Sequence, residues 1–113
     1  IFLFFFKFKL YLYINMKEFK RKINEDNFVL YRLGENAKDN HLIISDADPE
    51  DWWIHIDGLA SAHCIIEKIE VDELDLEFAS SHIRDNSKYK RHKNLRFCYT
   101  QVKNLKKQKI LVK

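Results

Sequence analysis

Four side chains near the middle of the chain can bind a metal ion or transfer a proton: Asp51, His55, Asp57 and His63. His55 and His63 lie eight positions apart and flank a turn, so neighbouring strands could hold them side by side. Two histidines and one carboxylate form a known metal-binding set. However, neither a zinc spacing nor an H-E-x-x-H motif accompanies them. The alternative is a structural role, in which each histidine bonds a buried polar group between strands.

Other features of the sequence give little support to catalysis. The chain has two glycines, Gly34 and Gly58, and no glycine-rich phosphate loop, which argues against nucleotide hydrolysis and dinucleotide binding. The serines lack the context of a nucleophile elbow. Two cysteines, Cys64 and Cys98, lie in apolar runs, and we expect them to be reduced, as in the cytoplasm. We predict no enzyme activity, no cofactor and no bound metal.

Basic residues concentrate in the last thirty positions of the chain. Residues 84–113 hold eleven Lys and Arg residues and one acid, a net charge of +10, whereas residues 1–83 carry −7. This asymmetry indicates an anionic partner at the basic end. Aromatic and polar residues among the cations suit phosphate contacts combined with stacking. The alternative is a solvated, lysine-rich surface. The predicted nucleic-acid contacts are Lys88, Lys90, Arg91, Lys93, Arg96, Lys103, Lys106 and Lys107.

The elements that must position these residues follow from hydrophobic patterns. Apolar and β-branched runs predict strands, and one amphipathic stretch predicts a helix. Together they predict an α+β fold: a small mixed or antiparallel sheet of about four to five strands with one main helix packed on it. The expected strands are 28–33, 52–56, 62–66 and 95–100, with a fifth beginning at 110–112, and the expected helix is 72–84.

Individual residues add detail to the helical segments and to the central strand. The nearly continuous apolar run 62–66 predicts a central strand covered on both faces. Asp72 can cap the main helix, and Leu74 and Phe78 begin its expected inward stripe. Asn36 can cap a short helical turn, or it can begin a polar loop.

Two adjacent tryptophans must point to opposite faces of the strand that carries them. We expect Trp53 to face the core. Trp52 then lies on the other face, where either a helix covers it or it stays free for stacking.

The first fifteen residues, IFLFFFKFKLYLYIN, are set apart by their composition. Lys7 and Lys9 interrupt a run that is already too short for a transmembrane helix, and a signal-peptide cleavage site is lacking. We expect residues 1–15 to be a non-native or disordered leader, with Met16 as the true start; a strand or anchor of the protein is the alternative. Residues 16–113 are expected to form one domain without a membrane segment.

Four segments, in the same order, resemble the NFACT-R (NFACT RNA-binding) domain family. Residues 31–40 resemble its G-x-N-A-x-x-N opening, residues 49–55 its P-x-D-x-W-x-H signature, and residues 57–63 the following G/S-S/A-H. Residues 98–107 resemble its late V-x-Y-T segment with the Lys-Lys pair. The signature positions are Gly34, Asn36, Asn40, Asp51, Trp53, His55, Ser61, His63, Tyr99 and Thr100.

The resemblance implies RNA binding, in this family often on the large ribosomal subunit and tRNA, and it connects the chain to ribosome-associated quality control. The Ser61-Ala62-His63 version is closest to the short stand-alone eukaryotic members. The usual Gly-x-Val after the Lys-Lys pair is absent, which leaves open a truncated C-terminal strand.

The leading hypothesis is therefore a non-catalytic, cytoplasmic RNA-binding module whose basic residues bind phosphates. A metal- or His-dependent enzyme acting on nucleic acid is the first alternative. A protein-interaction adaptor, whose acidic half around residues 72–75 docks a basic partner, is the second. In the leading hypothesis the signature surface is formed or supported by Asp51, Trp53, His55 and His63.

Overall fold

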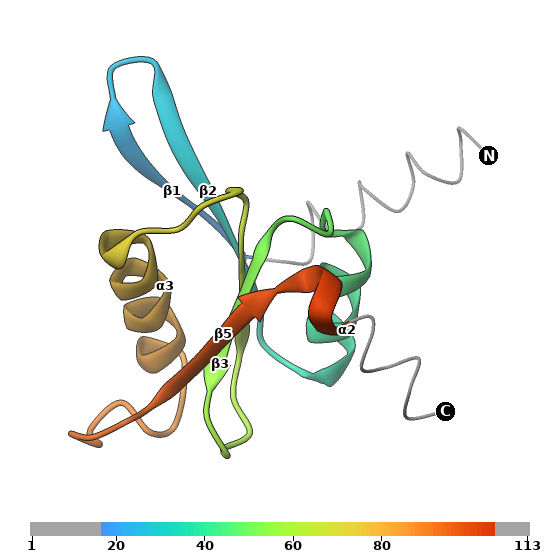
Figure 1. Ribbon diagram of the computed structural model, residues 1–113. Coiled ribbons are helices and arrows are strands. Elements are labelled where there is room, and N and C mark those ends of the chain that lie inside the picture. Colours follow the sequence, from blue (N-terminus) through green and yellow to red (C-terminus); the bar gives the residue numbers. More distant parts are fainter. Residues whose placement is uncertain (1–16, 106–113) are drawn as a thin grey trace.

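A five-stranded antiparallel sheet lies between two helices in the computed structural model, which describes residues 17–105. The helices α2 and α3 pack on opposite faces of the sheet (Figure 1). The expected α+β class is therefore confirmed, with two packed helices in place of one main helix. The strands are β1 (Lys17–Asn24), β2 (Asn27–Gly34), β3 (Trp52–Ile56), β4 (His63–Ile66) and β5 (Phe97–Gln101), and the helices are α2 (Ala37–Asp46) and α3 (Glu73–Asp85).

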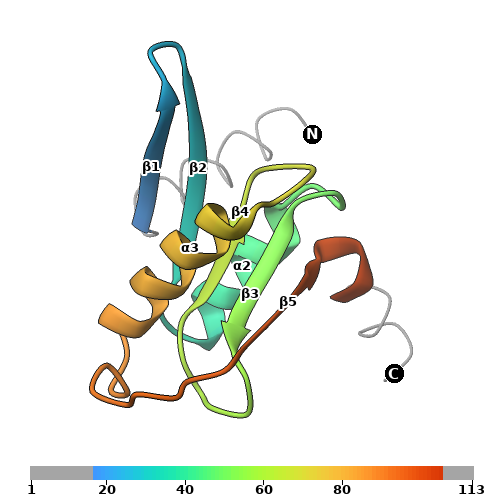
Figure 2. The same cartoon turned by 60° about the vertical axis from the view of Figure 1, so that its left-hand side comes forward.

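The strand order is β1-β2-β4-β3-β5, and each neighbouring pair is antiparallel. β4 is thus the central strand, as its apolar run predicted, and Figure 2 shows β5 at one edge beside β3. A turn at Gly58, where φ is +75°, lets β4 return between β2 and β3. That backbone conformation favours glycine because it has no Cβ to clash.

Most of the apolar core lies between the sheet and α3. Strand alternation sends Tyr31, Leu33 and Ile54 to this face, where they pack with Ala79 and Ile83 of the helix. All five side chains are at most 1% exposed. Burying one large aliphatic side chain contributes about 1.5–3 kcal/mol, so this face supplies much of the stability of the domain.

A smaller core lies on the other face, under α2. It consists of Ile43, Ile65 and Val102, with Trp53 packed against it. The expected inward position of Trp53 is confirmed, although its side chain is only half-buried. Trp52 packs against the larger core on the α3 face, also half-buried, and its indole N–H donates to the carbonyl of Ile69 over 2.8 Å.

The inward stripe of α3 differs from the predicted one. Leu74 is 60% exposed, and the buried side chain in the first turns is Asp75. Asp72 caps the helix as expected, and Asp75 completes a capping box by accepting from the Asp72 backbone N–H. Side chains from other elements also bond Asp75, which is why a charged residue takes the inward position that an apolar residue was expected to fill.

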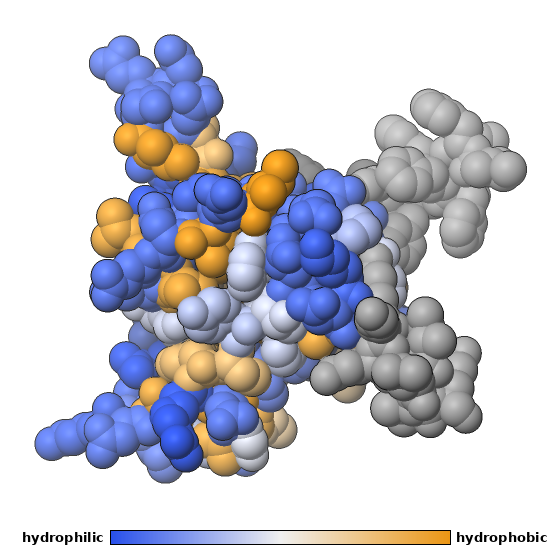
Figure 3. All heavy atoms as spheres, in the orientation of Figure 1, coloured by the Kyte–Doolittle hydropathy of each residue, from blue (hydrophilic) through white to orange (hydrophobic). Residues whose placement is uncertain are grey.

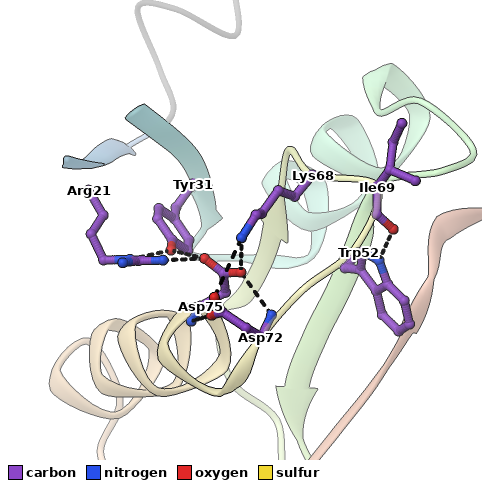
Figure 4. A network of polar contacts seen from close by, with 7 residues as sticks. All are labelled: Arg21, Tyr31, Trp52, Lys68, Ile69, Asp72 and Asp75. Atoms are coloured by element: carbon purple, nitrogen blue, oxygen red, sulfur yellow. Dashed lines mark hydrogen bonds and ion pairs between the residues drawn. The ribbon is translucent and has the colours of Figure 1, made fainter. Parts of the chain in front are cut away.

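Figure 4 shows these partners around the Asp75 carboxylate. Arg21 of β1 forms an ion pair with it, Lys68 donates to it over 2.6 Å, and the Tyr31 hydroxyl donates over 3.1 Å. Burial alone would raise the pKa of Asp75, but these hydrogen bonds, with one from the Asp72 backbone, lower it to about 2. The network joins the β1–β2 hairpin to the start of α3.

Two elements were absent from the prediction or incomplete in it. β1 is rich in charged residues and was not among the expected strands, yet Phe19 packs on the main core and Arg21 reaches Asp75. Only a short helical turn or a polar loop was expected after Asn36, whereas α2 is a helix of ten residues. Its predicted cap is confirmed, because the Asn36 side chain accepts from the Asp39 backbone N–H.

Several expectations lie outside the described residues: the leader 1–15, the strand at 110–112, and the side chains of Lys106 and Lys107. Between residues 17 and 105, no helix combines the length and apolar character needed to cross a membrane.

Candidate nucleic-acid interface

The two histidines of the signature meet on the α2 face of the sheet. In the β3–β4 pairing Ile54 lies opposite Cys64, so alternation places Trp53, His55 and His63 together on the other face. The His55 and His63 rings are 4.2 Å apart between centroids, and the Trp53 ring is 5.3 Å from that of His63. The predicted side-by-side placement of the histidines is confirmed.

Trp53 fixes the protonation of His63. Its indole N–H donates to the Nδ1 atom of His63 over 3.0 Å, so that nitrogen acts as an acceptor and the ring is neutral. Burial, together with a smaller contribution from the neighbouring His55, lowers the pKa of His63 to about 4. Burial also lowers the pKa of His55. Both rings are therefore uncharged aromatic surfaces at neutral pH.

Asn40 holds the strand that carries His63. Its side-chain oxygen accepts from the His63 backbone N–H over 3.1 Å, and its amide donates to the Ser61 carbonyl over 3.5 Å. Gly34 lets Asn40 come this close, because a Cβ there would stand 2.5 Å from the Asn40 oxygen and 2.8 Å from its backbone nitrogen. Asn40 is 8% exposed, so these bonds satisfy a buried amide.

Asn36 positions Asn40 by starting the helix. Its side chain accepts from the Asp39 backbone N–H over 2.9 Å, and its carbonyl accepts the first helical bond, from the Asn40 N–H, over 2.8 Å. Together with the preceding contacts, this connects Gly34, Asn36, Asn40, Ser61, His63, Trp53 and His55 into one unit.

Asp51 does not join the histidine pair. Its carboxylate accepts from the Asp48 backbone N–H over 3.1 Å, and its carbonyl accepts from Val102 over 2.8 Å, so it organises the loop before β3. Burial raises its pKa to about 6. It lines a small cavity of about 70 Å³ together with Arg32, Asp46 and Glu67, among others.

The proposed set of two histidines and a carboxylate therefore does not form around Asp51. Among residues 17–105, no group of three His, Cys, Asp or Glu side chains could hold a metal ion. The Nδ1 atom of His63 is also occupied by the Trp53 indole.

The last two signature residues lie on opposite faces of β5. Thr100 pairs with Trp53 and shares its face, and its hydroxyl accepts from the Asn104 side chain over 2.7 Å. Tyr99 pairs with Ile54 on the α3 face, is 51% exposed, and has its ring 5.9 Å from that of Trp52. Tyr99 is therefore separated from the histidines by the sheet.

β5 separates the predicted nucleic-acid contacts into those that precede it in the chain and those that follow it. Five of them lie in the loop between α3 and β5 (residues 86–96), shown in orange in Figure 1. Each of the five is exposed, and within residues 17–105 none forms an ion pair with an acid. Tyr89 anchors the loop on the main core. The five cations are Lys88, Lys90, Arg91, Lys93 and Arg96.

Lys103 stands apart from this loop. It follows the far end of β5, about 17 Å from the loop at the usual rise of a five-residue strand, and its Nζ atom pairs with Glu50 over 3.3 Å. In the described part of the chain, Lys103 and the five cations of the loop therefore do not form one continuous patch.

One adjacency was not predicted. The Asp57 backbone N–H donates to the Arg96 carbonyl over 2.8 Å, which extends the pairing between β3 and β5 by one residue. Because Cys98 pairs with His55, alternation places Arg96 and Cys98 on the histidine face. The alternation of Arg96, Cys98 and Thr100 was visible in the sequence, but its pairing partner was not.

Comparison with known proteins agrees with this arrangement. No curated protein matches the chain. The family model described as NFACT protein RNA binding domain matches residues 9–111, which covers the sheet, both helices and the basic loop. The chain therefore belongs to the family of NFACT protein RNA binding domains.

Proposed function

We propose that this domain is a non-catalytic, cytoplasmic RNA-binding module that acts on the ribosome or on tRNA, in the setting of ribosome-associated quality control. Membership of the RNA-binding family supports the RNA partner. The observation that carries the proposal is the loop 86–96. Its five exposed cations form no ion pair with an acid within residues 17–105, and its last cation, Arg96, reaches the histidine face by strand alternation.

The loop supplies the phosphate contacts. Lys and Arg side chains release counterions when they neutralise phosphates, and this electrostatic term dominates nucleic-acid affinity. Lys88, Lys90, Arg91 and Lys93 project from the loop, and Arg96 leads into β5 next to the histidines. Ion pairing at Glu50 reduces the attraction of Lys103 for phosphate.

The histidine face supplies a surface for bases. Neutral His55 and His63 rings next to Trp53 can stack on an unpaired base, as aromatic side chains do in single-stranded RNA recognition. A non-catalytic role agrees with the geometry, since the His63 Nδ1 atom is held by Trp53 and cannot act as a free base.

Ultraviolet crosslinking to a labelled single-stranded RNA, followed by mass spectrometry, tests this placement. We expect crosslinked peptides from the loop 86–96 and from the histidine strands β3 and β4. Crosslinks confined to α3 or to the β1–β2 hairpin would show that RNA binds elsewhere.

Sedimentation of the domain with ribosomes tests the finer proposal. We expect it to move with large-subunit fractions and to leave them when Lys90 and Lys93 are changed to Ala. The matched control, Lys20→Ala with Lys22→Ala, removes two exposed lysines from β1 and should remain bound. A domain that binds free RNA but never sediments with ribosomes would remove the ribosome from the proposal.

A further inference from the structure

A second surface, distinct from the histidine face, lies where α3 and the edge strand β5 leave part of the sheet uncovered. α3 packs mainly over β2, β4 and β3, so the residues of β5 on this face are only partly covered. Phe97 is half-buried there, Tyr99 is 51% exposed, and Trp52 lies next to Tyr99. In Figure 3, apolar and weakly polar side chains gather near the centre of this face, between strongly polar regions.

Phe97 lines a shallow groove of about 460 Å³ beside α3, and Tyr99 and Trp52 continue the aromatic surface beyond it. Leu76 and Ser80 of the helix form one wall, and Leu95 and Phe97 lie opposite. Beyond Trp52 the surface continues to Ile69, which is 69% exposed and whose carbonyl accepts the Trp52 indole N–H. Exposed aromatic and aliphatic side chains along one groove are typical of a protein-binding surface.

The α3 wall of the groove is acidic near the start of the helix, whereas Arg84 lines its other end. Glu73 and Glu77 line it from successive turns of α3, and Glu70 and Asp72 stand exposed in the segment just before the helix, beside Lys68. Asp75 takes no part, because its buried carboxylate is already bonded. The end of the groove that Glu73 and Glu77 line repels phosphates and attracts cations, so the partner that docks there is unlike the RNA that the basic loop binds.

The backbone of β5 offers a further means of recognition. β5 pairs only with β3 among the described strands, so its outer edge carries unpaired N–H and C=O groups. An extended peptide can add to such an edge, with alternate side chains pointing to each face. Its five residues match the length of a short linear peptide.

We propose that the groove between α3 and β5 is a docking site for an extended segment of a protein partner in which basic and apolar residues alternate. The peptide pairs with the free edge of β5. Its apolar side chains lie on Phe97, Tyr99 and Trp52, and its basic side chains meet Glu73 and Glu77. The domain thus holds RNA on one face and a basic protein segment on the other.

The test uses a fluorescein-labelled peptide, Lys-Val-Lys-Phe-Lys-Val-Lys, and fluorescence anisotropy. Reversing two groove charges (Glu73→Lys with Glu77→Lys) should weaken binding about tenfold, equivalent to about 1.4 kcal/mol. The matched control (Glu25→Lys with Asp26→Lys) reverses two exposed acids at the β1–β2 turn and should bind like the parent. Because both pairs are exposed, circular dichroism should show unchanged folding, and RNA affinity should not fall in either variant.

Strand addition is tested separately from charge. A peptide N-methylated at the positions whose N–H groups face β5 should bind at least about tenfold more weakly, and Tyr99→Ala should weaken the parent peptide. Equal weakening by the control variant, or no binding below about 1 mM, would overturn the docking site. Unchanged binding of the methylated peptide would overturn pairing with β5.

Discussion

Asn40 is the residue on which the geometry of the histidine face depends most directly. One short side chain bonds the backbone on both sides of Ala62, at His63 and Ser61, and thereby fixes the start of β4. No side chain of another type offers a donor and an acceptor at this length except aspartate in its protonated form. Gly34 and Asn36 matter because they let Asn40 approach and because they start its helix.

Replacement of Asn40 by Ala should destabilise the domain by about 2 kcal/mol, because it leaves the His63 N–H and the Ser61 carbonyl without a partner in a buried position. Urea denaturation followed by tryptophan fluorescence measures this loss. Asn94→Ala, in the exposed loop, is the control and should change stability by less than about 0.5 kcal/mol. Equal effects at the two positions would contradict the role given to Asn40.

His63 should resist protonation until the solution is strongly acidic. Its folded pKa of about 4 lies below the unfolded value of 6.5, so the unfolded chain binds the proton first. Its contribution to stability is therefore complete above pH 6.5 and declines as the pH falls towards 4. NMR titration should give a His63 midpoint near 4, with the Trp53 indole N–H signal shifting together with it. A midpoint near 6.5 would contradict the burial of the His63 ring beside His55.

At the scale of the elements, Asp75 connects parts of the fold that are distant in the sequence. Arg21 comes from β1, Tyr31 from β2 and Lys68 from the segment after β4, and all of them bond one carboxylate at the start of α3. The end of the β1–β2 hairpin extends beyond the other three strands of the sheet (Figure 1). Among the described residues, the network around Asp75 is the main polar attachment between this hairpin and α3.

Asp75→Ala should cost about 3 kcal/mol of stability, because the substitution leaves the buried Tyr31 hydroxyl and two cations without their partner. Glu77→Ala, an exposed position on the same helix, is the control and should be within about 0.5 kcal/mol of the parent. Since the folded pKa of Asp75 is depressed to about 2, its contribution is full above pH 4 and disappears between pH 4 and 2. The free energies of unfolding of Asp75→Ala and Glu77→Ala should therefore converge at about pH 2. A gap that persists there would contradict the ionic origin of the effect.

The sequence predicted the elements whose hydrophobic pattern agrees with their environment. β2, β3 and β4 have apolar or β-branched runs, β5 alternates and α3 has apolar residues at helical spacing, while the Asp72 and Asn36 caps are local signals. β1 was missed because an edge strand needs few apolar residues, and its charged side chains find partners only in the folded chain. Leu74 was predicted to face inward because the helical spacing of apolar residues cannot show that side chains from three other elements bond the Asp75 carboxylate.

The histidine pair was predictable from the spacing of two strands around a turn, but its chemistry was not. Whether His55 and His63 held a metal depended on the position of a carboxylate, and Asp51 turned out to bond its own loop. The basic stretch was visible as composition, yet only the register of β5 separates the loop cations from Lys103.

At the scale of the whole molecule, the charge asymmetry of the sequence becomes a division between surfaces. The basic loop leads through Arg96 to the histidine face, and Glu73 and Glu77 of α3 line the groove on the other face of the sheet. The central claim is that the loop 86–96, rather than the other lysines, carries the attraction for RNA.

A salt titration of affinity for a labelled single-stranded RNA tests this claim most directly. Each phosphate contact contributes about −0.7 to the slope of log affinity against log salt, so five loop contacts give a slope of about −3.5. Changing Lys90, Arg91 and Lys93 to Ala should bring the slope about two units closer to zero. The matched triple change of Lys17, Lys20 and Lys22 to Ala on β1 should leave the slope as in the parent. A slope unchanged by the loop substitutions, or reduced equally by the substitutions on β1, would contradict the account.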